Sequence, residues 1–211
     1  MEEGYIKFDQ TWQAASAPQA VDELIDLRQR LYRQGLIGYD ATQQVGFGNL
    51  SRRTQPGEAG LFIISGTQTG ALAQLTAEHF VAVTAYDLAA NRLHSQGPLR
   101  ASSESLTHAA VYASDPRHQV VLHVHSLRHW QRLYGQYPTT DPAAAYGTPD
   151  MAQSVLDLHR DHPALAELGI VVMSGHEEGL LAFGPDGPST YQRLQQALTW
   201  ANQQADERPD R

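Results

Sequence analysis

The segment 120–126 constrains the fold of this chain more than any other stretch. It reads Val-Val-Leu-His-Val-His-Ser, a β-branched run that is typical of a buried strand. Successive side chains of a strand point to opposite faces, so His123 and His125 point to the same face. Two imidazoles at this spacing can bind one metal ion, and imidazole suits zinc and neighbouring transition metals. The alternative is a pair of histidines on a solvated face.

Length and composition bound the class of protein. The 211 residues suffice for one domain with a sizeable core, or for two small ones. The composition is that of a soluble globular protein, and no apolar stretch reaches the length of a membrane span. The N-terminus lacks the basic and apolar parts of a signal peptide, so we expect a cytoplasmic protein. The net charge of −8, without a basic patch, argues against nucleic-acid or membrane partners.

Two residue types are scarce, and their scarcity limits the chemistry. The chain contains no cysteine, so a metal ion must be held by His, Asp, Glu or water. Lys7 is the only lysine, in a terminal stretch that we expect to be loosely ordered. A mechanism that needs a buried Schiff-base lysine is therefore not expected.

Periodicity and turn residues predict interspersed helices and strands. Helices are expected over 17–35, 102–113, 127–134, 148–159 and 188–204. Strands are expected over 45–53, 61–65, 80–84, 91–94, 119–124, 170–174 and 180–183. There are more strands than one βαβ series needs. The pattern predicts a single α/β/α layered domain with a central mixed, largely antiparallel sheet.

Two further residues are candidates for a site with the paired histidines. His176 lies in the turn 175–179 between two apolar strands and is a candidate third metal ligand, or else an ordinary turn histidine. Glu104 opens a helix that leads into the histidine strand, so its carboxylate can return to the same place. The alternative for Glu104 is a favourable partner of the helix dipole.

Three segments have the composition of an anion-binding cradle. They are 46–51, 65–70 and 102–103, which combine glycines with Ser, Thr and Asn side chains. Glycines let backbone N–H groups approach phosphate oxygens, and hydroxyl and amide groups add neutral donors. Because lysine is scarce, such neutral donors are a way to hold a phosphate. Each segment taken singly reads as an ordinary turn.

Taken in order, these motifs resemble the class II aldolase/adducin family. The resemblance covers about residues 20–200 and rests on Gly48-Asn49-Leu50-Ser51, the 65–70 loop, Ser102-Ser103-Glu104, His123-Val124-His125-Ser126 and Gly175-His176. It implies one class II aldolase-like domain over 1–211, with a core at about 20–204 and short terminal tails. The family includes L-fuculose-phosphate and rhamnulose-phosphate aldolases, ribulose-phosphate 4-epimerases, methylthioribulose-phosphate dehydratases and the non-catalytic adducin head.

The resemblance also implies roles for individual residues. Metal ligation falls on His123, His125 and His176, and Glu104 serves as the acid/base that can also touch the metal. The phosphate cradle falls on Asn49, Thr69, Gly70, Ser102 and Ser103, with Gly66-Thr67 as a competing pair in the loop. Tyr146 lies where aldolases of the family carry a tyrosine that reaches a neighbouring subunit's site, or else is a core or loop tyrosine.

The function that the resemblance implies is a metal-dependent lyase that cleaves a ketose phosphate through an enediolate. The implied metal is divalent, zinc first, with Mn²⁺, Co²⁺ or Fe²⁺ as alternatives, since imidazole sites accept several ions. The implied assembly is a homotetramer. A sugar-phosphate dehydratase or 4-epimerase on the same scaffold, or a non-catalytic adducin-like module, are the alternatives.

The remaining polar candidates receive less specific expectations. His108 falls one helical turn after Glu104 and is expected to be its partner. His118, His159 and His162 are expected in loops or on the surface. Arg52 and Arg53 are expected at the surface end of a strand, with contact between one of them and an anion as the alternative.

Overall fold

The computed structural model describes residues 5–54 and 61–206. Its strands are β1 (Asp9–Ala14), β2 (Gly38–Asp40), β3 (Val45–Phe47), β4 (Asn49–Arg53), β5 (Phe62–Ser65), β6 (Phe80–Asp87), β7 (Arg92–Gly97), β8 (Val120–His125), β9 (Ile170–Val172) and β10 (Gly179–Gly184). Its helices are α1 (Asp22–Arg33), η1 (Ala77–His79), α2 (Ser105–Ser114), α3 (Leu127–Leu133), α4 (Pro149–Asp161), α5 (Leu165–Leu168) and α6 (Gly187–Asp206).

One eight-stranded sheet organises the described residues, in the order β1-β7-β6-β5-β4-β8-β10-β9. All neighbouring strands in it run antiparallel except β1, which lies parallel to β7. A separate hairpin pairs β2 with β3. The predicted fold class, α/β with a mixed and largely antiparallel central sheet, is confirmed.

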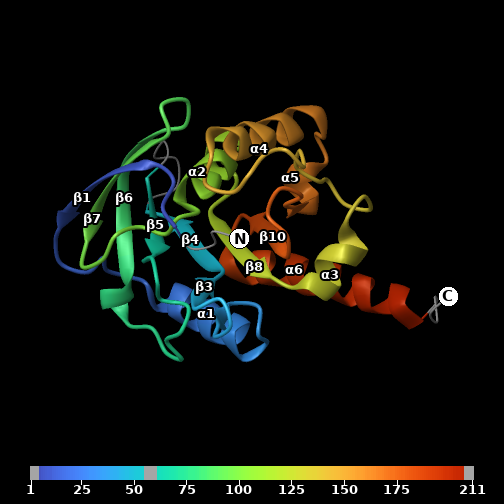
Figure 1. The fold of residues 1–211 in the computed structure, drawn as a ribbon, viewed down its shortest axis with the longest axis horizontal. Coiled ribbons are helices and arrows are strands. Elements are labelled where there is room, and N and C mark those ends of the chain that lie inside the picture. The colour runs from blue at the N-terminus through green and yellow to red at the C-terminus, as the bar shows by residue number, and fades with distance from the viewer. Residues whose placement is uncertain (1–4, 55–60, 207–211) are drawn as a thin grey trace.

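Helices cover both faces of the sheet and give the layered arrangement (Figure 1). Alternation along β5 decides which side chain meets which layer: Phe62 and Ile64 pack in the same core as residues of α2 and α4, whereas Ile63 packs with residues of α1 and α6. The sheet is therefore buried on both faces at its centre, and its strands read as continuous apolar runs.

Helix α1 shows how local sequence fixes an element. Leu24, Leu27 and Leu31 are buried at helical spacing, facing the sheet. The helix ends just before Gly35, which has a φ of +69°, a left-handed conformation that favours glycine. The charged residues of its outer face remain in contact with solvent.

The N-terminal stretch corrects one expectation. Residues 9–14, expected within a loosely ordered terminus, form the edge strand β1 along β7. Their sequence, Asp-Gln-Thr-Trp-Gln-Ala, lacks the apolar alternation that marks a strand, because an edge strand with largely exposed side chains does not need it. Backbone pairing, rather than side-chain burial, defines this element.

Two residues expected at the surface are buried instead. His118 is 1% exposed and lies against the rings of Phe183 and His159. Arg53 is 6% exposed, and its guanidinium donates hydrogen bonds to the carbonyl groups of His118 and Tyr112. Polar side chains of this kind enter a core when backbone carbonyls accept their hydrogen bonds, which a sequence pattern does not display.

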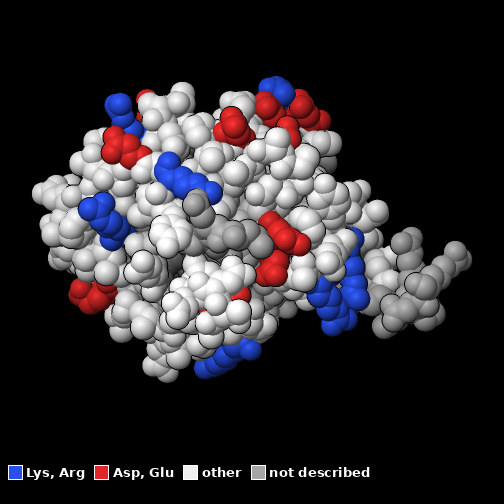
Figure 2. Space-filling view, in the orientation of Figure 1, with Lys and Arg blue, Asp and Glu red and all other residues white. Residues whose placement is uncertain are grey.

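The outer surface shows no dominant electrostatic patch on the face drawn in Figure 2, where basic and acidic side chains lie in small scattered groups, some of which contain both signs of charge. Within the described ranges, none of the helices combines the length and apolar character that crossing a membrane requires.

Candidate metal centre

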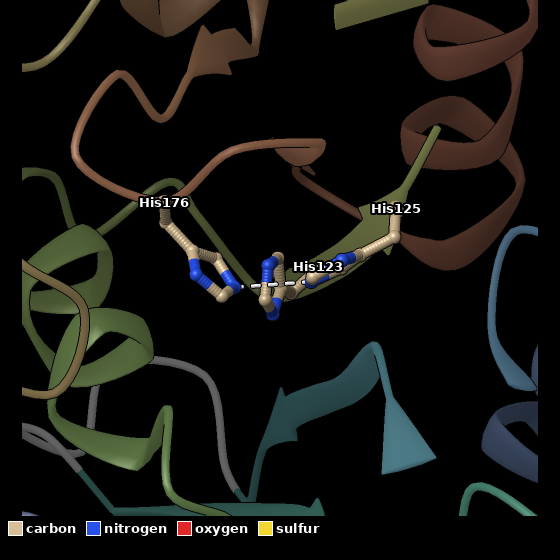
Figure 3. Close-up of side chains that lie close together, drawn as sticks. All are labelled: His123, His125 and His176. Carbon is tan, nitrogen blue, oxygen red and sulfur yellow. Dashed lines mark hydrogen bonds between the residues drawn. The ribbon is translucent and has the colours of Figure 1, made fainter. Parts of the chain in front are cut away.

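Three histidines meet at one end of the central strands (Figure 3). His123 and His125 come from β8, and His176 comes from the turn that precedes β10. Their ring centroids are 4.7 to 5.2 Å apart, and their candidate ligand nitrogens all lie within 4.8 Å of one another. The alternation of the strand explains the first pair, because residues two apart share a face.

The surroundings of these histidines favour their neutral form. All three are buried. Burial lowers the pKa of His123 and of His125 well below the usual range, and the neighbouring imidazoles lower both further. Burial, together with the charge of Lys7, lowers the pKa of His176 to about 4. Neutral imidazoles keep a lone pair, which is the form that binds a metal ion.

The donor set fits a divalent metal ion. The Nε2 atoms of His125 and His176 face each other at 3.0 Å. The Nε2 atom of His123 is buried, and no group in the described part of the chain forms a hydrogen bond with it. A cation at their convergence would partner all three nitrogens. Three nitrogen ligands without a thiolate are typical of a metal site that keeps a position open.

Gly179 makes the approach of the histidines possible. A Cβ atom at this position would lie 2.7 Å from Cδ2 of His176 and 3.3 Å from Nε2 of His123. The adjacent Glu178 was missed by the sequence analysis; its carboxylate lies 4.0 Å from Nδ1 of His125. A carboxylate beside the second ring nitrogen helps to orient a ligating imidazole.

Asn49 is paired with His123 by the register of the sheet. The two residues are opposite each other on β4 and β8, and Nδ2 of Asn49 lies 3.3 Å from Nδ1 of His123. Oδ1 of Asn49 is buried with no hydrogen-bond partner among the described residues. A half turn of the amide lets Oδ1 accept the Nδ1 proton of His123, which leaves Nε2 with its lone pair toward the cluster. Asn49 is thus placed to fix the tautomer of a ligand.

This arrangement leads to a prediction for Asn49. Replacing Asn49 with leucine, which has a similar volume but no amide, is expected to lower the metal affinity by about 10- to 100-fold, as is common when the partner of a ligating histidine is lost. Asn49→Asp is the matched control, because a carboxylate also accepts the Nδ1 proton. Competition with a chromogenic chelator measures both affinities, and a folded leucine variant with unchanged affinity would contradict this role.

Glu104 stands at the start of α2. It is the residue that precedes the first helical position, and it is 3% exposed. Thr107 donates a hydrogen bond to Oε2 of Glu104 at 2.8 Å, one turn along the helix. His108, expected as the partner of Glu104, instead contacts the hydroxyl of Ser51 through Nδ1 at 2.7 Å.

All the residues predicted from the sequence as site residues line one cavity of about 520 Å³. They are Asn49, Thr69, Gly70, Ser102, Ser103, Glu104, His123, His125, Tyr146 and His176. The competing pair Gly66-Thr67 lines it as well. Among the residues that line this cavity there is no lysine or arginine, and Glu104 is the only acidic one.

The loop 66–70 forms one wall, and Gly70 has a packing role there. A Cβ atom on Gly70 would lie 2.2 Å from the carbonyl oxygen of Gly38 and 2.6 Å from Cα of Gly46. The hairpin of β2 and β3 therefore packs backbone to backbone against this loop. The hydroxyl of Thr69 donates within the loop, to the carbonyl of Gly66 at 2.9 Å.

Tyr146 lies against the histidine cluster of its own chain. Its ring centroid is 4.7 Å from that of His176, and the Nζ atom of Lys7 lies 3.8 Å from the centroid of the Tyr146 ring. The sequence analysis missed Lys7 because nothing local in the sequence relates it to a residue 139 positions later. Lys7 lies two residues before β1, and the pairing of β1 with β7 places it near Tyr146.

Comparison with solved structures shows the same fold. L-fuculose-1-phosphate aldolase from Thermus thermophilus is 22% identical, with a TM-score of 0.59 over 85% of this chain and 89% of that one. A sugar-phosphate aldolase from Thermotoga maritima is 16% identical, with a TM-score of 0.62 over 85% and 90%. YgbL from Klebsiella pneumoniae, provisionally described as an aldolase/epimerase/decarboxylase, is 19% identical, with a TM-score of 0.64 over 89% of each chain.

Sequence comparison gives the family directly. No curated protein matches the chain significantly. The sequence profile described as "Class II Aldolase and Adducin N-terminal domain", however, matches residues 22–205, which is most of the chain and contains every histidine of the cluster. Members of this family that are class II aldolases use a divalent metal. The chain belongs to the class II aldolase and adducin N-terminal domain family.

Proposed function

We propose that this protein is a class II aldolase, an aldehyde-lyase that cleaves a ketose phosphate. One observation carries the proposal: three buried histidines and the carboxylate of Glu104 line the same cavity. A non-catalytic module needs neither of these, and a purely structural metal site usually closes with four protein ligands.

Each residue of the cavity has a role in this proposal. His123, His125 and His176 would hold the divalent ion. When bound, such an ion supplies Lewis acidity, which makes the C–H bond beside a carbonyl group more acidic. Glu104 removes the proton from that carbon in the condensation direction and returns it after cleavage. Thr107, which donates to Oε2 of Glu104, holds the carboxylate in one orientation.

Four other residues of the cavity would hold the phosphate group. Ser102 and Ser103 precede α2, where the positive end of the helix dipole favours an anion. Thr69 and Gly70 line the same cavity, in the loop whose first residue, Gly66, pairs with Ala101 just before these serines. Anchoring the phosphate fixes the distance between the reacting carbon and Glu104, which is an orientation effect on the rate.

Tyr146 is proposed as a second catalytic group. Its ring lies against that of His176 and lines the cavity of the same chain, which supports this role. A phenol in this position is suited to proton exchange with the aldehyde oxygen of the cleaved product.

The remaining properties follow from the family and are proposed with it. Zinc is the metal we propose, since three imidazoles suit it, with Mn²⁺, Co²⁺ and Fe²⁺ as the other candidates. We propose a cytoplasmic homotetramer whose partner is a small sugar phosphate. A closed symmetric assembly is the general expectation for homo-oligomers.

Deuterium exchange into dihydroxyacetone phosphate tests the proposed reaction. The protein is loaded with zinc, its metal content is measured, and the ketone is followed by proton NMR in heavy water. We expect loss of one hydroxymethyl proton signal, dependent on the loaded protein. Metal-stripped protein and zinc in buffer are the controls.

The result also separates the alternative reactions. If the loaded protein binds dihydroxyacetone phosphate but exchanges no proton, the aldolase proposal is wrong. The dehydratase and 4-epimerase activities on this scaffold would then be assayed next.

A further inference from the structure

One buried cation lies directly behind the anion-binding wall of the cavity. Arg28, on α1, is only 2% exposed and does not itself line the cavity. Its Nη2 atom donates hydrogen bonds to the carbonyl oxygens of Thr69 and Gly70 at 3.2 and 3.1 Å. Its Nη1 atom donates to the carbonyl oxygen of Ala73 at 3.3 Å. The guanidinium thus binds the backbone of this loop from its buried side.

The charge of Arg28 is not neutralised by a carboxylate. Within the described residues no acidic group pairs with it, and its other neighbour is the ring of Tyr32, whose centroid is 4.3 Å from Cζ. Burial lowers the pKa of Arg28 below its usual value, which nevertheless starts far above neutral pH. The carbonyl oxygens and the Tyr32 ring stabilise the buried guanidinium without neutralising its charge.

The hydrogen bonds of Arg28 also determine the direction in which the next N–H groups of the loop point. In a trans peptide the carbonyl oxygen and the following N–H group point to opposite sides. Because the guanidinium holds the oxygens of Thr69 and Gly70, the N–H groups of Gly70 and Ala71 point away from it. Neither N–H group has an acceptor among the described residues. Ala71 is exposed at the surface, whereas Gly70 lines the cavity, so the loop has one N–H donor without a protein acceptor, that of Gly70, beside the cavity and opposite Arg28.

None of the described residues that line the cavity is a lysine or arginine, although Glu104 lines it. Lys7 lies over the ring of Tyr146 and is not among the lining residues, so a dianionic ester in the cavity would directly meet only the carboxylate of Glu104 as a charged side chain. Charge behind a single layer of backbone, away from water, acts with little screening. Arg28 is in that position through its contacts with Thr69 and Gly70.

We propose that Arg28 is a positioning residue for the anionic group of the substrate, and that it makes this cavity select a phosphate monoester over the neutral parent ketone. The inference rests on the proposed function for its substrate class. Arg28 acts in two ways: it fixes the loop 66–70 with the N–H group of Gly70 beside the cavity, and it places one positive charge behind that group.

Arg53 provides a matched control for Arg28. It is similarly buried, it also donates hydrogen bonds to backbone carbonyls, and its guanidinium lies 4.8 Å from the ring of Tyr112. It is not among the residues that line the cavity, and its hydrogen bonds to the carbonyl groups of His118 and Tyr112 fix other segments than the loop 66–70. Replacing either arginine should lower the free energy of unfolding, whereas only the replacement of Arg28 should lower the affinity of the cavity for anions.

Calorimetric titration of the zinc-loaded protein tests the proposal. The probes are inorganic phosphate, dihydroxyacetone phosphate and dihydroxyacetone, with R28M, R28K and R53M compared at equal metal content. We expect R28M to weaken both phosphate-bearing probes by about 10-fold or more, the loss of one favourable charge interaction. The affinity for dihydroxyacetone should stay unchanged, R28K should recover part of the loss, and R53M should match the native protein.

The outcomes separate this inference from the proposed reaction. Unchanged phosphate affinity in a folded R28M protein, or equal weakening of dihydroxyacetone, would overturn the role of Arg28 and leave the aldolase proposal standing. Arginine-dependent phosphate binding without deuterium exchange would support the anion site and contradict the aldolase reaction. If R28M does not fold, R28Q gives the same contrast, because it too removes the charge.

Discussion

Replacing Glu104 with glutamine is expected to lower the rate of deuterium exchange into dihydroxyacetone phosphate by about 10²- to 10⁴-fold, the usual contribution of a positioned acid or base. Glutamine has the shape of glutamate, and its amide oxygen can still accept the hydrogen bond that Thr107 donates to Oε2. It cannot take up a proton from carbon. Metal content and the affinity for dihydroxyacetone phosphate should therefore change much less than the exchange rate.

Glu177→Gln is the control for this substitution. Glu177 follows the ligand candidate His176 in the chain, yet its side chain is exposed and does not line the cavity. The same chemical change there should leave exchange near its native rate. An E104Q protein that exchanges at the native rate would remove Glu104 from the mechanism, whatever its metal content.

Replacing His123 with alanine is expected to lower the zinc affinity by more than about 100-fold. Loss of the hydrogen-bond partner of a ligating histidine can already lower the affinity by that factor, and loss of the ligand itself should lower it further. His123 is one of three mutually close ligand candidates: its ring centroid is 4.9 Å from that of His125 and 5.2 Å from that of His176. Removing it leaves two nitrogens, too few to hold the ion in a fixed geometry. Equilibrium dialysis followed by elemental analysis gives the affinity, and exchange activity should fall with occupancy.

His118→Ala separates metal loss from general damage. His118 is as buried as His123, and burial likewise lowers its pKa, to about 4. It lies against Phe183 and His159, away from the cavity. The H118A protein should be less stable but bind zinc with native affinity. An H123A protein that retains full stoichiometric zinc would show that the ligand assignment is wrong.

Local patterns in the sequence predicted the elements that carry the histidines. The run that contains His123 and His125 is a β-branched strand, and its alternation alone places both imidazoles on one face. The start of α2 after Ser102-Ser103-Glu104 was also readable, because hydroxyl and acidic residues are common at helix starts. The layered α/β architecture followed from the count and order of such elements.

What the sequence did not reveal depends on contacts between distant segments. The place of Lys7 over the ring of Tyr146 depends on β1 pairing with β7, and β1 has no apolar alternation to mark it. The hydrogen bonds from Arg28 to the carbonyl oxygens of Thr69 and Gly70 join residues more than 40 positions apart. A periodic pattern shows that a helix has a buried face, but not that an arginine on it meets a loop.

The backbone contact between Gly70 and the hairpin of β2 and β3 has a practical consequence for engineering. Because Gly38 and Gly46 meet Gly70 without side chains between them, the hairpin is a fixed rim on which Tyr39, Gln43 and Gln44 reach the cavity. None of these three belongs to the proposed metal or anion groups. A small combinatorial library at Tyr39, Gln43 and Gln44 would therefore vary which aldehyde partner is accepted, while the reacting end of the cavity keeps its composition.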